Sequence, residues 1–377
     1  MNATDVIVVG GGVIGQTIAW RTAQRGRAVT LVDPDPGRGA SWAAAGMLAP
    51  VAEAAYGETA LLRANAASHR RWPTFARALE EASGVEVGYR ECGTLVVARE
   101  ADDVGELDRL HGYHTELGLD AVRLRGREAR SLEPALTPGL RGAVHSPGDH
   151  QVDNRAVVRA LAVAGQRVGV RVDHRAGKRL LTAGGRVRGL ELDDGSELLS
   201  AVVVVAAGAG SIHIEGFPEG GRPHVRPVKG QLLHLRVPEG EPPLTQRTIR
   251  GNGVYIVSRG DGRVVVGATV EERGFDRRVT AGGVYELLRR AYELVPAIVE
   301  CELVEATTGL RPGTPDNAPL VGQGPLDGLM IATGHYRNGM LLTPLTGDGM
   351  AQLLTDGTLA DELVPFSPLR FTSAAVP

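Results

Sequence analysis

The chain has 377 residues, of which 43% are hydrophobic and 23% charged, and its 41 basic and 44 acidic residues leave a formal net charge of -3. This length exceeds the size at which a single hydrophobic core stops growing, so we expect two lobes. The near balance of charges gives no support for binding to nucleic acid or to a membrane surface.

The two cysteines, Cys92 and Cys301, lie in no CxxC or zinc-type spacing, and the histidines show no metal-ligand spacing with carboxylates. We therefore expect reduced thiols and no metal site. The beginning of the sequence lacks the basic, apolar and small-residue pattern of a signal peptide, which favours a cytoplasmic location.

The N-terminal segment predicts a dinucleotide site. Residues 6–9 form a β-branched run typical of a central parallel strand buried on both faces, and a G-x-G-x-x-G motif and a helix pattern follow at once. A second strand, residues 28–32, ends in an acid at the spacing that suits the ribose hydroxyls. The glycines allow a tight turn, a close approach of the pyrophosphate and close packing of helix on strand, with the phosphates at the helix N-terminus. The predicted ligands are Gly10, Gly12, Val13, Ile14, Gly15 and Asp33.

A run of small residues, 39–50, follows the second strand, where an NAD dehydrogenase would more usually continue into another helix and strand. Such residues let the backbone lie against a bulky ligand, although a flexible linker has the same composition. We expect the contacts to come from Ser41, Ala45, Gly46 and Met47. Two long helix patterns follow, at residues 60–82 and 104–117.

Two later segments favour FAD over NAD. Residues 197–208 predict one buried strand that ends in Ala-Ala-Gly, so that Ala207 and Gly208 can approach a ligand. Residues 329–333 predict a short strand, and a glycine-bounded turn at 334–339 leads to a helix near residues 345–354. A second helix terminus of this kind could stabilise negative charge at the far end of an extended cofactor.

Arg311 and Tyr255 are the candidate substrate ligands. Arg311 follows a predicted strand at residues 303–306 and has no acid nearby in sequence until Asp316, so its guanidinium is available for a substrate carboxylate. Tyr255 begins a strand that faces residues 263–267 and could reach the other carboxylate oxygen. A surface arginine and a core tyrosine are the plainer alternatives.

These motifs, in this order and spacing, resemble the D-amino-acid-oxidase-like (DAO) family of flavoenzymes, and within it the glycine oxidase branch. The resemblance covers nearly the whole chain and includes the fingerprint, the small-residue run, residues 149–154, 202–209, 226–231, 255–257 and 308–316, and Gly-His-Tyr-Arg-Asn-Gly-Met at 334–340. It implies an α/β fold, with a Rossmann-type FAD-binding domain on a parallel sheet (residues 1–49, 142–225 and 306–365). A substrate-binding domain on a mainly antiparallel sheet (residues 50–141 and 226–305) is implied beside it.

The resemblance also implies roles for individual residues. The matching arginine and tyrosine of the family bind the substrate carboxylate, which agrees with Arg311 and Tyr255, and Arg337 is expected to orient the flavin side or the substrate entrance. The flavin contacts near the second helix would come from His335, Arg337, Asn338, Gly339 and Met340. Gly309 stands near the position of the cysteine that links flavin covalently in sarcosine oxidases, so FAD is expected to be non-covalent. Some glycine oxidases have a histidine at the position of Gly253, so the residue that forms the polar side of the pocket in this chain is not identified.

The implied reaction is oxidation of a small amino acid, with glycine as the first candidate. Hydride transfer would give an imine, water would convert it to glyoxylate and ammonia, and oxygen would be reduced to hydrogen peroxide. The resemblance also suggests that the imine serves thiazole formation for thiamine. The sequence does not decide whether the protein forms a homo-oligomer. The alternatives are a sarcosine or D-amino acid oxidase or dehydrogenase, and a 2-hydroxy-acid oxidoreductase of the same fold.

Overall fold

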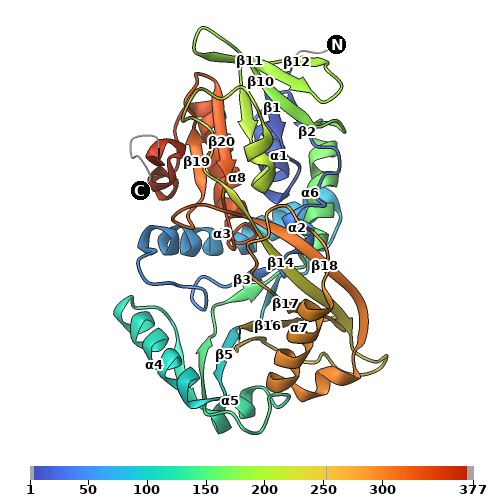
Figure 1. Cartoon of the computed structure of the whole chain (residues 1–377), viewed down its shortest axis with the longest axis vertical. Helices are drawn as coiled ribbons and strands as arrows, with labels where there is room; N and C mark the ends of the chain where they lie inside the picture. Colours follow the sequence, from blue (N-terminus) through green and yellow to red (C-terminus); the bar gives the residue numbers. More distant parts are fainter. Residues whose placement is uncertain (1–3, 252, 372–377) are drawn as a thin grey trace.

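A computed structural model describes residues 4–251 and 253–371 of the chain. Figure 1 shows an elongated molecule with one large sheet toward each end of its long axis. No helix within these residues is long and apolar enough to cross a membrane. The fold is a mixed α/β fold with parallel and antiparallel sheets, as expected.

The first large sheet has six strands and carries the N-terminal fingerprint. Its order is β19 (Leu320–Gln323), β20 (Leu329–Thr333), β13 (Val203–Val205), β1 (Val6–Val9), β2 (Val29–Val32) and β9 (Arg171–Asp173). All neighbours are parallel except β19, which is antiparallel to β20. Strand β1 lies in the middle of the sheet and is fully buried, as its β-branched run predicts.

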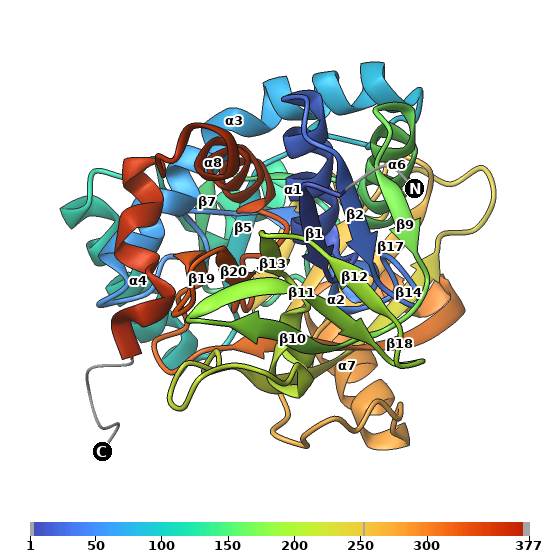
Figure 2. The same cartoon turned by 90° about the horizontal axis from the view of Figure 1, so that it is seen from above.

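The two faces of this sheet are covered by different layers, as Figure 2 shows. Val6 and Val8 face a core that includes apolar side chains of four helices, whereas Ile7 and Val9 face a second core with Leu180 and other residues of a small sheet. The helices are α1 (Val13–Gln24), α3 (Thr59–Ser83), α6 (Asn154–Arg167) and α8 (Thr343–Asp356). The small sheet consists of β10 (Gly177–Ala183), β11 (Arg186–Leu192) and β12 (Glu197–Leu199). Alternate side chains of β1 therefore fill two separate cores.

The second large sheet has eight strands and is mainly antiparallel. Its order is β18 (Glu302–Gly313), β14 (Arg226–Arg236), β17 (Arg263–Gly267), β16 (Val254–Ser258), β15 (Thr248–Gly251), β5 (Thr94–Ala98), β7 (Gly142–Ser146) and β6 (Val122–Arg125). Only β5 and β15 pair in parallel among its described strands. Three helices accompany this sheet: α4 (Ala101–Glu116), α5 (Gly126–Leu132) and α7 (Ala281–Leu294).

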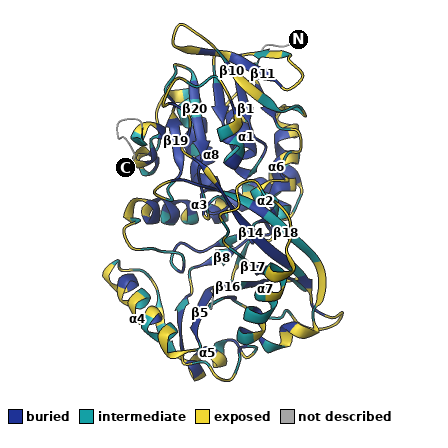
Figure 3. Cartoon of the chain, viewed as in Figure 1, coloured by how far each residue is buried: buried dark blue, intermediate teal, exposed yellow. Residues whose placement is uncertain are grey.

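Short elements join the two large sheets. They are α2 (Ala40–Ala43), the sheet of β3 (Met47–Leu48), β8 (His150–Gln151) and β4 (Arg90–Glu91), and the 3₁₀ helix η1 (Gly208–His213). The other 3₁₀ helices lie elsewhere: η2 (Pro296–Glu300) contacts α7, and η3 (Asp361–Phe366) and η4 (Pro368–Phe371) contact β19. Strand β18 contacts both α2 and η1. The end of β18 that carries Arg311 is thereby placed beside the small-residue run. In Figure 3 the part of β18 beside α2 is coloured as buried or intermediate.

The predicted single strand at residues 197–208 is wrong, because two strands of different sheets share this stretch. Strand β12 ends at Leu199 and β13 begins at Val203. Between them the Ser200 hydroxyl donates to the Asp5 carbonyl at 2.8 Å and accepts from the Val202 amide at 3.1 Å. These bonds turn the chain from the small sheet into the six-stranded sheet, so the change of sheet falls at Ser200, just before the apolar run at residues 201–209.

Two segments pack differently from the domain assignment predicted from the sequence. Helix α3 packs on α6 and α8 in the core of the six-stranded sheet, although residues 50–141 were expected in the substrate-binding part. Strand β7 belongs to the eight-stranded sheet, although the expected boundary lies just before it, at residues 141/142. The division into two domains with these boundaries stays a prediction.

Candidate functional site

A cavity of about 280 Å³ lies at the carboxyl ends of β1, β2 and β13 and reaches the beginning of α8 and the end of β18. Ligands bind at this edge in open α/β sheets. The structure brings most of the predicted site residues together in its lining: Gly10, Gly12, Val13, Ile14, Asp33, Ser41, Ala45, Gly46, Met47, Ala207, Gly208, Tyr255, Arg311, His335, Arg337, Gly339 and Met340. Gly15 and Asn338 lie behind this lining.

The turn between β1 and α1 has the geometry that the glycine motif predicts. Gly10 has φ +107°, and a Cβ atom at Gly15 would collide with the Gly10 carbonyl oxygen. Gly15 therefore acts by letting α1 pack against the turn. The Val13 amide, at the start of α1, donates to Ser41 Oγ at 3.0 Å. Polar groups from both segments thus meet at one end of the cavity.

Asp33 lies at the carboxyl end of β2 and is held in place by two backbone amides. Its Oδ2 accepts from the Gly11 amide at 2.6 Å, and its Oδ1 accepts from the Asp35 amide at 2.8 Å. A carboxylate with both oxygens fixed next to the glycine turn can accept further bonds from hydroxyl groups. The predicted ribose ligand therefore stands at the cavity with a defined orientation.

The other end of the cavity is built by the turn that precedes α8. His335 is buried, and its Nε2 lies 3.0 Å from Thr346 Oγ1 in α8. Burial lowers the pKa of His335 to about 3, so its imidazole is neutral near pH 7. Asn338 is also buried, and its backbone amide donates to the His335 carbonyl at 2.8 Å. These residues fix the backbone of the turn, while Arg337 projects from it and is exposed.

The small-residue run forms a wall of the cavity, and its carbonyls are bound from behind. Asn154 Nδ2 donates to the carbonyls of Ser41 and Trp42 at 2.9 and 3.0 Å. The Val152 amide donates to the Gly46 carbonyl at 2.9 Å, and Gly46 has φ +75°. The residues of 39–46 that line the cavity are all small, so the backbone itself can lie against it, and Trp42 is not among them.

Arg259 is a further support of this wall, and sequence reasoning gave it no role. Its Nη2 donates to the Ala45 carbonyl and its Nη1 to Gln151 Oε1, both at 2.6 Å. Burial lowers the pKa of Arg259 to about 10, so the side chain still carries its charge near neutral pH. The sequence does show a charged residue at the end of an apolar strand, which could have indicated a buried role for Arg259. Its partners could not be predicted, because they lie more than 100 positions away in the chain.

Arg311 of β18 and Tyr255 of β16 meet at the cavity, over the eight-stranded sheet. Arg311 Nη1 donates to the Thr269 carbonyl at 3.1 Å and lies 3.5 Å from the Lys229 carbonyl. Arg311 forms no ion pair with a carboxylate in the described part of the chain. Burial raises the pKa of Tyr255 to about 12, although the charge of Arg311 and a hydrogen bond to it act in the opposite direction. Tyr255 is therefore a neutral donor beside a cation that has no carboxylate partner among the described residues.

Two glycines make room for this pair. A Cβ atom at Gly230 would lie 2.5 Å from Arg311 Nη2, and one at Gly267 would collide with the Tyr255 ring. Gly267 is the direct cross-strand partner of Tyr255. The guanidinium and the phenol can lie flat on the sheet only because these positions carry no side chain.

A second cavity of about 490 Å³ adjoins the first and shares four lining residues with it: Glu53, Tyr255, Arg311 and Arg337. We call it the outer chamber. Its other lining includes apolar residues such as Leu107, Val254 and Val270. Glu53 lies 3.4 Å from Arg250 Nη2. Among the described residues Glu53 is the one carboxylate that lines both cavities, and sequence reasoning missed it.

The remaining chemical candidates lie away from the cavity or fill other roles. Gly309 lines the cavity beside Ala43, so no sulfur atom stands at this position. Cys92 and Cys301 are free thiols and belong to neither cavity lining. Within residues 4–251 and 253–371, no group of three or more His, Cys, Asp or Glu side chains could hold a metal ion.

Comparisons with known proteins agree with this geometry. The family model described as "DAO: FAD dependent oxidoreductase" matches residues 5–353. A glycine oxidase of Geobacillus kaustophilus is 37% identical over 381 residues, with 97% of each chain covered. A crystal structure of glycine oxidase from the same organism has a TM-score of 0.91 at 36% identity and covers 98% of this chain and 99% of that one.

A bifunctional ThiO/ThiG protein of a Synechocystis species is 36% identical over 381 residues. The match covers 100% of this chain but 55% of that protein, so the chain spans about half the length of this relative. Because the family model covers most of the chain and the relatives match it over nearly its full length, the chain belongs to the DAO family of FAD-dependent oxidoreductases.

Proposed function

We propose that the protein oxidises a small amino acid with oxygen, and that glycine is the first substrate to test. The observation that carries this proposal is Arg311, a cation with no carboxylate partner in the described chain, placed between the cofactor cavity and the outer chamber. A guanidinium of this kind is suited to an anionic ligand. The similarity of the chain to proteins named glycine oxidase supports the same substrate class.

The lining residues fit FAD as the family implies. The α1 N-terminus and Gly12 would receive the pyrophosphate, and Asp33 would accept bonds from the ribose hydroxyls. The wall at residues 41–47 and the turn at 335–340 would hold the ring system. Bound FAD supplies the two-electron acceptor of the reaction. No lining residue is a cysteine, which supports non-covalent attachment.

The protein groups would act by positioning the substrate. Arg311 and the neutral Tyr255 hydroxyl would hold the two carboxylate oxygens. Arg337, an exposed residue that lines both cavities, would limit how the substrate enters. Glu53 is paired with Arg250 and would favour a positive charge in the outer chamber rather than remove a proton from carbon. The substrate would react with its amine neutral, and the products would be an imine, then glyoxylate and ammonia.

A larger amine is the second candidate, favoured by the outer chamber. A space of about 490 Å³ beside Arg311 exceeds the needs of glycine and could receive an N-substituent or a side chain. Sarcosine and D-amino acids are therefore tested with glycine. A role of the imine in thiazole formation for thiamine is implied by the family resemblance, and the ThiO name of three relatives supports it.

Anaerobic reduction of the purified yellow protein tests the proposal. The bound flavin should lose its absorbance with glycine, sarcosine, iminodiacetate or a D-amino acid, and the order of rates would assign the substrate. Glycolate serves as the hydroxy-acid control. Bleaching by glycolate but by no amine would refute amino-acid oxidation.

Acid precipitation should release the flavin into the supernatant, and flavin that stays in the pellet would refute only the non-covalent attachment.

A further inference from the structure

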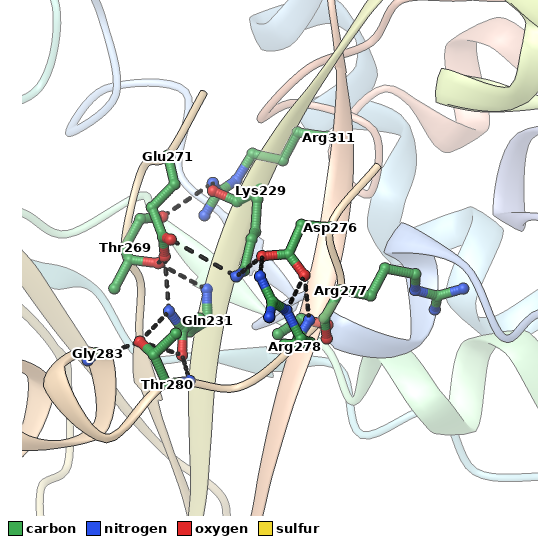
Figure 4. A network of polar contacts seen from close by, with 11 residues as sticks. Lys229, Gln231, Thr269, Glu271, Asp276, Arg277, Arg278, Thr280, Gly283 and Arg311 are labelled. Atoms are coloured by element: carbon green, nitrogen blue, oxygen red, sulfur yellow. Dashed lines mark hydrogen bonds and ion pairs between the residues drawn. The ribbon is translucent and has the colours of Figure 1, made fainter. Parts of the chain in front are cut away.

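Lys229 is a buried charge that the proposed reaction does not use. Its side chain in β14 is 1% exposed, and its Nζ atom lies 3.4 Å from Asp276 and 3.6 Å from Glu271. Figure 4 shows the ammonium between these two carboxylates. A lysine buried to this degree needs its charge compensated. Lys229 lines neither cavity, so it does not touch the substrate.

The two carboxylates belong to the segment that follows β17, and this segment is bound along β14. Lys229 and Glu271 exchange two backbone hydrogen bonds, at 2.9 and 3.0 Å. The Gln231 amide donates to Thr269 Oγ1 at 2.8 Å, and Gln231 Nε2 donates to Glu271 Oε1 at 2.7 Å. We call residues 268–276 the wall segment, because Ala268 and Val270 line the outer chamber.

The wall segment also holds Arg311. Both carbonyls within reach of Arg311 Nη1, those of Thr269 and Lys229, belong to this bonded pair of segments. Figure 4 shows Arg311 directed at this junction. Because Thr269 lies two residues before Glu271, the ion pairs of Lys229 restrain the carbonyl that orients the guanidinium.

We propose that Lys229 is a positioning residue for substrate binding. Its ammonium holds Glu271 and Asp276, keeps the wall segment on β14, and so fixes the Thr269 carbonyl and the direction of Arg311. This inference rests on the proposed role of Arg311 as the carboxylate ligand. Lysine is suited to this place because one compact ammonium can pair with two carboxylates at once.

The test compares Lys229→Met with Lys178→Met in the holoenzyme. Lys178 is also paired with a carboxylate, Glu191 at 3.1 Å, but lies in β10 and outside both cavities. Lys229→Met should raise the KM for the best amino-acid substrate about tenfold or more, with kcat within about twofold, because a small displacement of a binding group is costly. Lys178→Met should leave both constants unchanged.

Limited trypsin digestion gives a readout that does not depend on activity. The wall segment and the residues after it carry Arg273, Arg277 and Arg278, which are exposed. Lys229→Met should accelerate cleavage after these arginines, as mass spectrometry of the fragments would show, and Lys178→Met should not. Glu271→Gln removes one ion pair from the partly exposed side and carries the same test if Lys229→Met fails to fold.

The outcomes separate this inference from the proposed function. If Arg311→Ala raises KM but neither Lys229→Met nor Glu271→Gln does, the positioning role is overturned and the function stands. Faster digestion with an unchanged KM also overturns it, because Lys229 would then be structural only. If Arg311→Ala itself leaves KM unchanged, the carboxylate assignment fails, and the positioning role fails with it.

Discussion

Arg259 Nη2 lies 2.6 Å from the carbonyl oxygen of Ala45. This bond joins a buried cation in the eight-stranded sheet to the wall of the cofactor cavity. The two residues are 214 positions apart, and they bring the small-residue run and β16 together. The bond is charge-assisted and buried, so it is of the stronger kind.

Arg259→Met should therefore weaken FAD binding by the apoprotein. Loss of a hydrogen bond to a charged group costs about 1.5–3 kcal/mol, which corresponds to a rise of roughly tenfold to a hundredfold in Kd. Fluorescence titration of apoprotein with FAD measures this. Arg159→Met, which replaces an exposed arginine of α6, is the matched control. An unchanged Kd for Arg259→Met would show that the cofactor-cavity wall at residues 41–47 holds its shape without the arginine.

Arg311→Ala should leave FAD bound and the fold intact, yet raise the KM for the amino-acid substrate steeply. A substrate carboxylate left poorly paired in a partly dry site costs on the order of 2–5 kcal/mol. Arg311→Lys should recover only part of this, because an ammonium lacks the planar fork. Steady-state kinetics with the amino acid and with a matched amine that lacks a carboxylate test the claim. Turnover of the amino acid that survives within a few-fold would contradict it.

Gly230→Ala should reproduce much of the Arg311 defect without touching the arginine. The new Cβ atom would lie 2.5 Å from Arg311 Nη2, so the guanidinium must move. We expect a rise in KM of about tenfold or more, with FAD content unchanged. Gly139→Ala, where a Cβ would meet no atom within 4 Å, is the matched control. Equal KM values for the two variants would mean that Arg311 does not bind substrate in the position described.

His335 should make the folded state sensitive to acid. Its pKa is lowered from 6.5 to about 3 by burial, so the unfolded chain binds one more proton between these values. Stability from this group is complete above pH 6.5 and is lost as the pH falls, by up to about 1.4 kcal/mol per pH unit.

Denaturant unfolding of the holoprotein at pH 7 and pH 5 measures this effect. His335→Asn should lose less stability between the two pH values than the parent, whereas His174→Asn, at an exposed histidine, should behave as the parent does. The same pH dependence in all three proteins would show that His335 is not the group responsible.

The sequence by itself determined the local parts of this protein. The glycine turn, α1, β2 and Asp33 are formed within some 30 consecutive residues, and the bond from the Gly11 amide to Asp33 is made inside this stretch. Buried apolar runs predicted β1 and β20, and periodicity predicted α3 and α8 closely. The fingerprint is continuous in sequence and predicted dinucleotide binding by itself, whereas the preference for FAD also needed the small-residue run and the later segments at residues 197–208 and 329–354.

Only the tertiary structure decided how the substrate side is built. Arg311, Gly230, Thr269 and Lys229 meet because β14 lies between β18 and β17, and Arg259 meets Ala45 through a buried junction of two sheets. Residue types alone do not reveal such partners, since strand order and register are set by packing over the whole sheet. The change of sheet after Leu199 was missed for the same reason: β12 pairs with β11, whereas β13 pairs with β1 and β20, and only these partners show that the two strands belong to different sheets.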